Sequence, residues 1–489
     1  MTSLGRALSL AVLTGLTACG GADGGGEVSA SSADGIDKVS STQLPQWRHN
    51  MAENSRINLA LNTQAAIDPE LDPARNPNYP GNAPWRGQTA YAGAFVYGTL
   101  QYAKDLGRYG SIVGTIGGHN AYWGNEVVRF DIASRQFAHL SDPYSSSSHS
   151  GSFFRNPSQE NQHSDRENGE LFIDSSFNTD QTQPTGFHPY SSNVVLPPDA
   201  STGVGSHGAL ITPVRAARTP LQLSSPTSKR THIFDLAQSN RATAAWQRFA
   251  TNLFSTQEAG KWLFMGWAAY DPTRKKVFAG IEGGWSNQLK VLNPVTRQWD
   301  TPLTLTGDIL GMGSGRLLMY QHIGAWHWSA NPDYLIVFRG GEGTTGITGA
   351  TSPVALPWLI LINLSTGQCY LPGTTGTAPK LVGGADFVQS SNKMALYEGG
   401  VTSDQEEAGP GFINRVWILT PSSTTDPAVF TTTPWVWTFE DVTGPTPPAQ
   451  QARVIPHAGR FVWADKVKAF IWWANGVDNV QAWSVRGFF

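Results

Sequence analysis

The sequence predicts an all-β protein built from repeated antiparallel sheets, and three observations lead to this expectation. Charged residues make up only 15% of the 489 residues, which indicates that much of the chain is buried. The chain contains 18 Trp residues, whereas disordered chains carry few aromatic residues. Its 52 Gly and 31 Pro residues indicate many turns. Together these features predict a turn-rich β protein with a large core.

A short apolar run that ends in a diglycine recurs along the chain. The complete runs before a diglycine cover residues 111–116, 277–282, 335–339 and 394–398, and a degenerate copy covers 470–476. The diglycines at 283–284, 340–341 and 399–400 follow one another at nearly equal intervals. A repeat of this length is typical of one four-stranded blade of a β-propeller.

A second apolar strand and then an aromatic residue follow most of these runs. We expect these strands at 127–131, 232–235, 289–293, 359–363 and 416–419, followed by Phe137, Trp246, Trp299, Tyr370 and Trp435. This order resembles the kelch repeat, in which a diglycine follows the second strand and a Trp opens the fourth. The resemblance covers about residues 91–489, although the unit around Ser206–Ile211 lacks the diglycine. It implies a closed β-propeller of the kelch type, with four-stranded antiparallel sheets.

The two ends of the repeat region predict how the ring closes. Val480–Val485 has the pattern of a third strand with no fourth strand after it, and Gln43–Arg48 has the pattern of a fourth strand alone. We expect the N-terminal strand at 43–48 to complete the last blade, because closure removes exposed sheet edges. The repeats predict six blades, and a seventh blade within residues 142–187 is the alternative.

Two long irregular segments lie within the single propeller domain that we expect at residues 43–489. Five Pro residues between positions 69 and 84 argue against regular structure near 54–90. The segment near 142–187 is rich in Ser, Asn, Gln and Asp. Loops of this length inside a compact domain are usually functional or disordered.

The first 18 residues resemble a bacterial lipoprotein signal peptide. Arg6 precedes a short apolar stretch, and Leu16-Thr17-Ala18-Cys19 is similar to the lipobox. The apolar stretch is too short to span a bilayer by itself. The resemblance implies a lipidated Cys19, a flexible tether at 19–42 and a place in the bacterial cell envelope, as an outer-membrane lipoprotein held by its lipid anchor. A plain secretory signal is the alternative.

Net charge and cysteine count exclude several functions. The formal net charge of −3 shows no basic excess, so we expect no nucleic-acid partner. Apart from Cys19, Cys369 is the only cysteine, which excludes a disulfide within a lipidated chain and a multi-cysteine metal site. We expect neither a metal nor a cofactor. Cys369 falls at the outer edge of a blade, which argues against the Cys–Tyr crosslink of a copper–radical oxidase.

One motif carries the most specific candidate site. The segment 117–126 resembles the Gly-Gly-His…Gly-Asn-Glu-Val segment of bacterial kelch proteins related to the central domain of galactose oxidase. The resemblance implies that His119, Tyr122 and Asn125 lie on the face around the central channel, as hydrogen-bonding and stacking groups. The alternative is a turn in which the side chains of His119 and Asn125 bond to backbone.

The residues before three successive diglycines form a second candidate. Glu282, Arg339 and Glu398 occupy equivalent positions, so we expect them near the channel mouth at similar depth. Arg339 could hold an anionic or hydroxylated ligand, and the two carboxylates could act as acid and base across a sugar. The alternative is a belt of ion pairs between blades. Trp285 could stack on a sugar ring, although Trp in such positions more often packs between blades.

These observations predict a membrane-anchored propeller that binds a glycan or another cell-envelope component through its channel face. One alternative is a polysaccharide lyase or hydrolase that uses His119, Tyr122, Glu282 and Arg339. Another is a scaffold for protein partners. Propellers host both binding proteins and enzymes, so the fold does not decide between them, and we assign no catalytic residue.

Overall fold

A computed structural model of the chain describes residues 43–60, 100–115, 127–141, 193–199, 203–212, 230–238, 244, 246–252, 266–281, 288–308, 322–339, 359–379, 384–397, 414–422, 426, 429–430, 432–447, 460–474 and 479–489. These residues belong to one compact unit, Ile36–Phe489. Within them, α1 (Gln46–His49) is the one helix, and the remaining elements are strands. The predicted all-β class is confirmed.

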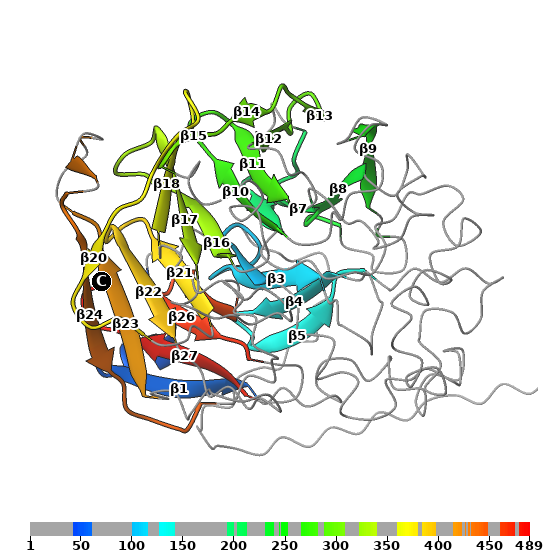
Figure 1. Ribbon diagram of the computed structural model, residues 1–489. Coiled ribbons are helices and arrows are strands. Elements are labelled where there is room, and N and C mark those ends of the chain that lie inside the picture. Colours follow the sequence, from blue (N-terminus) through cyan, green and yellow to red (C-terminus); the bar gives the residue numbers. More distant parts are fainter. Residues whose placement is uncertain are drawn as a thin grey trace, which may run out of the picture. The chain divides into compact units, whose positions relative to one another are not determined.

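The strands form six antiparallel sheets, which we call blades 1 to 6 in chain order (Figure 1). Each blade starts at its innermost strand and runs outward, strand by strand. Blades 1 and 2 consist of β2 (Leu100–Ala103), β3 (Ser111–Thr115), β4 (Val127–Asp131) and β5 (Gln136–His139), and of β6 (Val194–Leu196), β7 (Ala209–Thr212), β8 (Arg230–Asp235) and β9 (Gln247–Asn252).

Blades 3 and 4 consist of β10 (Gly266–Asp271), β11 (Lys276–Ile281), β12 (Gln288–Asn293), β13 (Gln298–Trp299) and β14 (Leu303–Thr304), and of β16 (His322–His327), β17 (Tyr334–Arg339), β18 (Leu359–Asn363) and β19 (Gln368–Tyr370). Blades 5 and 6 consist of β21 (Gly384–Val388), β22 (Lys393–Tyr397), β23 (Arg415–Thr420) and β24 (Trp435–Asp441), and of β25 (Phe461–Ala464), β26 (Ala469–Trp472), β27 (Val480–Ser484) and β1 (Ser55–Ala60).

Three blades carry an additional short strand, which the prediction of four-stranded sheets did not include. In blade 3 the outer strand is split, because β13 and β14 both pair with β12. The chain then adds β15 (Thr306–Gly307) in parallel to β19 of blade 4, and β20 (Thr374–Thr375) in parallel to β24 of blade 5. Each of these two connections crosses the outer edge of the next blade, where it occupies hydrogen-bonding groups that would otherwise be free.

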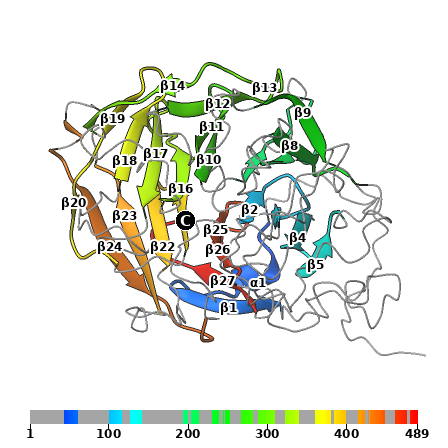
Figure 2. The same ribbon diagram turned by 45° about the vertical axis from the view of Figure 1, so that its right-hand side comes forward.

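The innermost strands form a closed ring. Strand β2 contacts β6, β6 contacts β10, β10 contacts β16, β16 contacts β21, β21 contacts β25, and β25 contacts β2 (Figure 2). Because each innermost strand contacts the next one directly, no further blade fits between β2 and β6. The ring therefore has six blades, and the seventh that we considered within residues 142–187, which lie outside the described residues, has no place in it.

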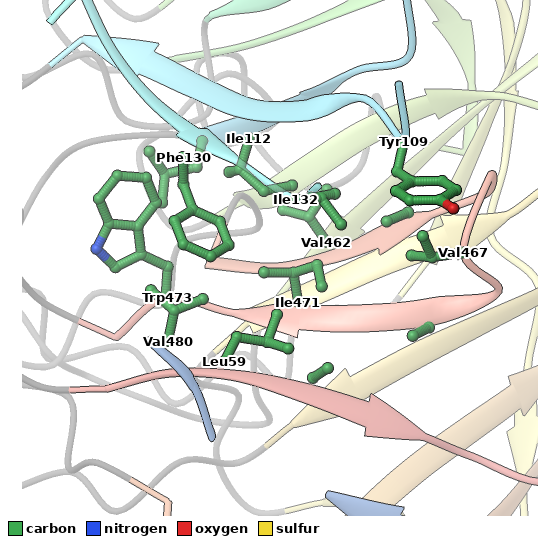
Figure 3. Packing of buried hydrophobic residues seen from close by; sticks show 14 of the residues in the cluster. Leu59, Tyr109, Ile112, Phe130, Ile132, Val462, Val467, Ile471, Trp473 and Val480 are labelled. Carbon is green, nitrogen blue, oxygen red and sulfur yellow. The ribbon is translucent and has the colours of Figure 1, made fainter. Parts of the chain in front are cut away.

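The hydrophobic core consists of six clusters, one between each pair of neighbouring blades. Between blades 6 and 1, Phe130 and Ile112 pack against Trp473, Ile471 and Val462 (Figure 3). Strands that are buried on both faces leave little room for charged side chains, which explains the low charge content. Many of the Trp side chains lie between blades, and those below 2% exposure are Trp267, Trp328, Trp417, Trp435, Trp472, Trp473 and Trp483.

An N-terminal strand does close the last blade, but it is not the predicted one. Strand β1 pairs antiparallel with β27, from Ser55 opposite Ser484 to Ala60 opposite Val480. The predicted strand at 43–48 is wrong, because Gln46–His49 form α1 and Trp47 packs into the cluster between blades 6 and 1. The predicted loop near 54–90 is also wrong in its first part, because residues 55–60 form β1. Residues 61–90 lie outside the described residues.

Candidate functional site

One end of the ring gathers the loops in which we expected a site. In each blade the second strand ends beside the start of the first, as His322 at the start of β16 lies opposite Arg339 at the end of β17. Gly384 at the start of β21 likewise lies opposite Tyr397 at the end of β22. The loops between second and third strands and the entries into the blades therefore share this end, which we call the channel face.

The residues predicted from sequence fall at the channel face only in part. Arg339 is the last residue of β17, and its backbone is described although its side chain is not. Glu282 and Glu398 come directly after Ile281 of β11 and Tyr397 of β22 in the sequence. Those two residues and the remaining candidates lie outside the described residues: His119, Tyr122, Asn125, Glu282, Trp285, Glu398 and the lipidation candidate Cys19.

The structure adds a charged residue on an innermost strand that the sequence analysis missed. Asp386 is the middle residue of β21, and both of its carboxylate oxygens accept hydrogen bonds. Oδ1 accepts from the indole N–H of Trp326 in blade 4, at 2.9 Å, and from the backbone N–H of Phe387, at 2.8 Å. Oδ2 accepts from the backbone N–H of Trp463 in blade 6, at 2.7 Å. Asp386 thus links blades 4, 5 and 6 from the inside of the ring.

The environment of Asp386 brings the pKa of its carboxyl group close to neutral pH. Burial raises the pKa of the carboxyl from 3.8 to about 6, while the three N–H donors act to lower it. The side chain is still partly exposed. Its two partners outside β21, Trp326 and Trp463, belong to the innermost strands β16 and β25, so the carboxyl group lies at the inner edge of the blades. A carboxyl group in this state can accept hydrogen bonds from hydroxyl groups of a ligand, or exchange a proton with it.

A polar residue at the channel face itself is neutral and fully enclosed. Asn193, directly before β6, donates from Nδ2 to the hydroxyl of Thr115 at 2.9 Å, and its Oδ1 accepts from the hydroxyl of Thr212 at 2.8 Å. Thr115 ends β3 and Thr212 ends β7, so the three side chains join blades 1 and 2. Asn193 is 0% exposed. This network stabilises the ring and offers nothing to a ligand.

Arg460, directly before the innermost strand β25, is the other polar residue described at the channel face. Its backbone carbonyl accepts from the N–H of Trp473 at 3.0 Å, which places it opposite the end of β26. Nη1 of its guanidinium donates to the carbonyl of Ala474, and the residue is 1% exposed. Burial lowers the pKa of Arg460 to about 9, so the group still carries its charge at neutral pH.

Sequence patterns carried a weak signal for these residues. Asp386 is the single charged residue within the otherwise apolar Gly384–Val388, and Arg460 directly precedes the apolar Phe461–Ala464. A lone charge inside or beside a buried strand requires a partner or a function. Which blades such a residue joins depends on contacts between distant parts of the chain, and these contacts are absent from the local pattern.

Other kinds of site find no support in the part of the chain that the structure describes. Within it, no three His, Cys, Asp or Glu side chains come together as a metal site would need. Cys369 lies on β19, the fourth strand of blade 4, as expected, and burial raises the pKa of its thiol to about 12. Among the described helices, none has the length and apolar character for a membrane crossing.

Comparisons with known proteins add little to this picture. No protein-family model and no curated protein matches the chain. A structural genomics protein of unknown function from Bacteroides thetaiotaomicron is similar over 79% of this chain and 70% of its own, with 8% identity and a TM-score of 0.38. A chain of a mitotic checkpoint complex is similar over 79% and 89%, with 12% identity and a TM-score of 0.34.

The β-propeller domain of Cps50 (Swd1) from Myceliophteria thermophila is similar over 79% of this chain and 95% of its own, with 8% identity and a TM-score of 0.37. Likenesses at this level carry no argument about function. The assignment to the β-propeller fold rests on the six sheets and on the closed ring of their innermost strands.

Proposed function

We propose that the protein is a binding propeller of the bacterial cell envelope, tethered through a lipidated Cys19, that binds a glycan at its channel face. The observation that carries this proposal is the pair formed by Asp386 and Trp326 on adjacent innermost strands. The pair lies deeper in the ring than the channel face, because Asp386 is opposite Ala395 and Trp326 is opposite Ile336. Both side chains are partly exposed. A carboxylate accepts hydrogen bonds from sugar hydroxyls, and an aromatic ring packs against the apolar face of a sugar ring.

The positions of Glu282, Arg339 and Glu398 in the sequence are consistent with this proposal. Arg339 ends β17, while Glu282 and Glu398 follow the ends of the equivalent strands β11 and β22. These three residues would therefore add hydrogen-bonding groups for ligand hydroxyls at equivalent positions of blades 3, 4 and 5. The alternative role for this trio, a belt of ion pairs between blades, is tested by the same experiments.

A panel of purified oligosaccharides tests the proposal. Binding of neutral, amino and uronic sugars is measured by isothermal titration calorimetry with the wild type, Trp326→Phe and Trp417→Phe. Trp326→Phe removes the indole N–H that holds the Asp386 carboxylate, together with part of the aromatic face, and should weaken binding at least tenfold, about 1.4 kcal/mol. The matched control, Trp417→Phe, alters a Trp buried between blades 4 and 5 and should lower only the melting temperature. Equal affinities of the two variants would overturn the proposal.

The trio has its own test. If Arg339→Ala loses glycan affinity while its melting temperature stays unchanged, Arg339 belongs to the site. A lower melting temperature with unchanged affinity would instead identify the belt of ion pairs.

The two alternative functions give different results in the same panel. Release of unsaturated or reducing ends, abolished by His119→Ala, would identify a polysaccharide lyase or hydrolase. Protein partners that copurify in the absence of any glycan binding would identify a scaffold.

The membrane anchor is tested separately, in cells. Cys19→Ser should move the protein from the membrane fraction to the soluble fraction if Cys19 carries the lipid. An unchanged distribution would favour the plain secretory signal.

A further inference from the structure

Arg460 presents an unusual buried cation at the channel face. Its side chain is almost entirely enclosed, at 1% exposure, and only Nη1 has an acceptor, the carbonyl of Ala474. Nε and Nη2 have no hydrogen-bond partner within the part of the chain that the structure describes. Likewise, no carboxylate of the described residues lies within ion-pair distance of the guanidinium.

The geometry of the unpaired atoms is specific. Nε–H and one N–H of Nη2 point to the same side of the planar guanidinium and form a fork with two parallel donors. A fork of this kind matches the two oxygens of a carboxylate or the oxygens of a sulfate, which it binds with two hydrogen bonds. Enclosing such a group without a partner is unfavourable, because a buried charge loses its hydration and gains nothing in return.

A second buried arginine shows how this protein satisfies a guanidinium for structural purposes. Arg56 of β1 is 4% exposed, and each of its three nitrogens has an acceptor. Nε donates to the carbonyl of Pro445, and Nη1 donates to that of Val442 at 2.8 Å. Nη2 donates to Oδ1 of Asn414 at 2.7 Å and to the carbonyl of Gly444 at 3.2 Å. Among the described residues, the fork of Arg460 has no such set of carbonyl oxygens.

We propose that Nε and Nη2 of Arg460 bind an oxyanion of the ligand at the channel face, and that this oxyanion is the carboxylate or sulfate of an acidic sugar. The inference rests on the proposed glycan-binding function and names its ligand class. Arg460 precedes the innermost strand of blade 6, and Trp463 of that strand donates its N–H to Asp386. An oligosaccharide with its acidic sugar at Arg460 would thus extend along β25 toward the carboxyl group of Asp386.

The test uses sodium sulfate, sodium D-glucuronate and D-glucose as probes, with the full-length chain purified in detergent. Thermal unfolding is recorded at constant ionic strength, with chloride replaced stepwise by sulfate or glucuronate. A ligand that binds only the folded state raises the melting temperature with its concentration. We expect sulfate and glucuronate to raise it, and D-glucose at the same concentration to raise it less.

Variants assign the effect to Arg460. Arg460→Lys keeps the positive charge but removes the fork, and it should weaken the binding of glucuronate at least tenfold. Arg56→Lys is the matched control. It should lower the melting temperature in the absence of ligand and leave the shift caused by glucuronate unchanged.

Three outcomes would overturn the proposal. Sulfate and glucuronate without effect on the wild type would show that the fork has a partner within the chain, and this result does not depend on any variant. Equal shifts in the wild type and in Arg460→Lys would place the anion elsewhere. Binding of neutral oligosaccharides that is independent of Arg460 would leave the proposed function intact and reject only the acidic ligand.

Discussion

The outer and the inner edge of blade 6 each carry a buried arginine, and the two are satisfied in different ways. At the outer edge, every guanidinium nitrogen of Arg56 in β1 donates a hydrogen bond to an oxygen atom near β23 and β24 of blade 5. The guanidinium also lies 4.9 Å from the ring centre of Trp483. At the inner edge, the residues that the structure describes give Arg460 one acceptor for three nitrogens.

The outer edge of blade 6 serves stability, and the proposed binding lies at its inner edge. The outer edge is where the N-terminal strand closes the ring, and there every nitrogen of the Arg56 guanidinium donates to an oxygen atom of the chain. The inner edge presents Arg460, incompletely paired among the described residues, and the partly exposed Asp386 on the neighbouring innermost strand β21. Residues that leave hydrogen-bonding capacity unused inside a fold are found more often at functional sites than elsewhere.

The largest expected effect comes from breaking the outer edge. Replacing Ser55–Ala60 by a Gly/Ser segment of equal length removes β1, its ladder with β27 and the buried side chains of Arg56 and Leu59. We expect a loss of about 5 kcal/mol or more in the free energy of unfolding, measured by urea titration. The same replacement of Thr374–Thr375, an added strand on blade 5, is the control and should change it little. A small loss for the β1 replacement would show that closure contributes little.

The next effect isolates the outer arginine. Arg56→Met keeps the length of the side chain but leaves four oxygen acceptors without their donors. Because buried acceptors that lose their partners are destabilising, we expect the free energy of unfolding to fall by about 3 kcal/mol. Ligand affinity should stay unchanged. A variant as stable as the wild type would contradict the structural role of Arg56.

At the inner edge, Asp386 predicts a dependence of stability on pH. Its pKa is about 6 in the folded protein and 3.8 without the fold, so the folded state binds the proton more tightly between these values. Stability from this group therefore rises as the pH falls from above 6 to below 4, by about 3 kcal/mol at most. Asp386→Asn should remove this contribution from a series of urea titrations. If the difference between wild type and variant is the same at pH 4 and pH 7, the pKa of Asp386 is not raised.

The smallest change in stability is expected for the inner arginine. Arg460→Met removes a buried cation that has a single acceptor, and replacement of an unpaired buried charge by an apolar side chain is often neutral or stabilising. We expect the free energy of unfolding without ligand to stay within about 1 kcal/mol of the wild type or to exceed it. Urea titration in chloride, without sulfate or glucuronate, measures this directly. A loss as large as that of Arg56→Met would show that Arg460 already has a partner in the chain.

Much of the fold was predictable because blade strands carry local patterns. The expected strands at 127–131 and 359–363 coincide with β4 and β18, and the diglycines at 283–284 and 399–400 follow the ends of β11 and β22 in the sequence. The strand pattern and the turn that follows it come from the same short stretch of chain, so local sequence was sufficient. The kelch type of these repeats stays a prediction.

A turn that recurs between the third and fourth strands is also visible in the sequence, but it did not enter the prediction of these strands. Oδ1 of Asn293 accepts the backbone N–H of Thr296, and Oδ1 of Asn363 accepts that of Thr366. The residue after each of these turns has positive φ: 57° at Arg297 and 75° at Gly367. Asn or Asp followed four residues later by a left-handed residue marks a tight hairpin between strands. This signal would have predicted where the third strand of a blade ends and the fourth begins.

The closing strand was misplaced because two neighbouring segments, Gln43–Arg48 and Ser55–Ala60, both contain the mixed polar and apolar residues of a strand. Gln43–Arg48 contains Trp47, whose burial is equally compatible with a helical turn, and the many Pro residues after Ala60 suggested an irregular segment from Asn54 onward. The alternation of polar and apolar residues in Ser55–Ala60 marks a strand. Its polar Arg56 is buried because blade 5 supplies acceptors from residues 414–445, and no local pattern contains those contacts.

The most direct measurement compares the two arginines of blade 6 in one experiment. Urea titrations of Arg56→Met and Arg460→Met are recorded with chloride and with D-glucuronate at equal ionic strength. We expect Arg56→Met to be less stable by about 3 kcal/mol yet still stabilised by glucuronate, and Arg460→Met to be as stable as the wild type and unaffected by glucuronate. Equal losses of stability in both variants, with no effect of glucuronate on the wild type, would contradict this expectation.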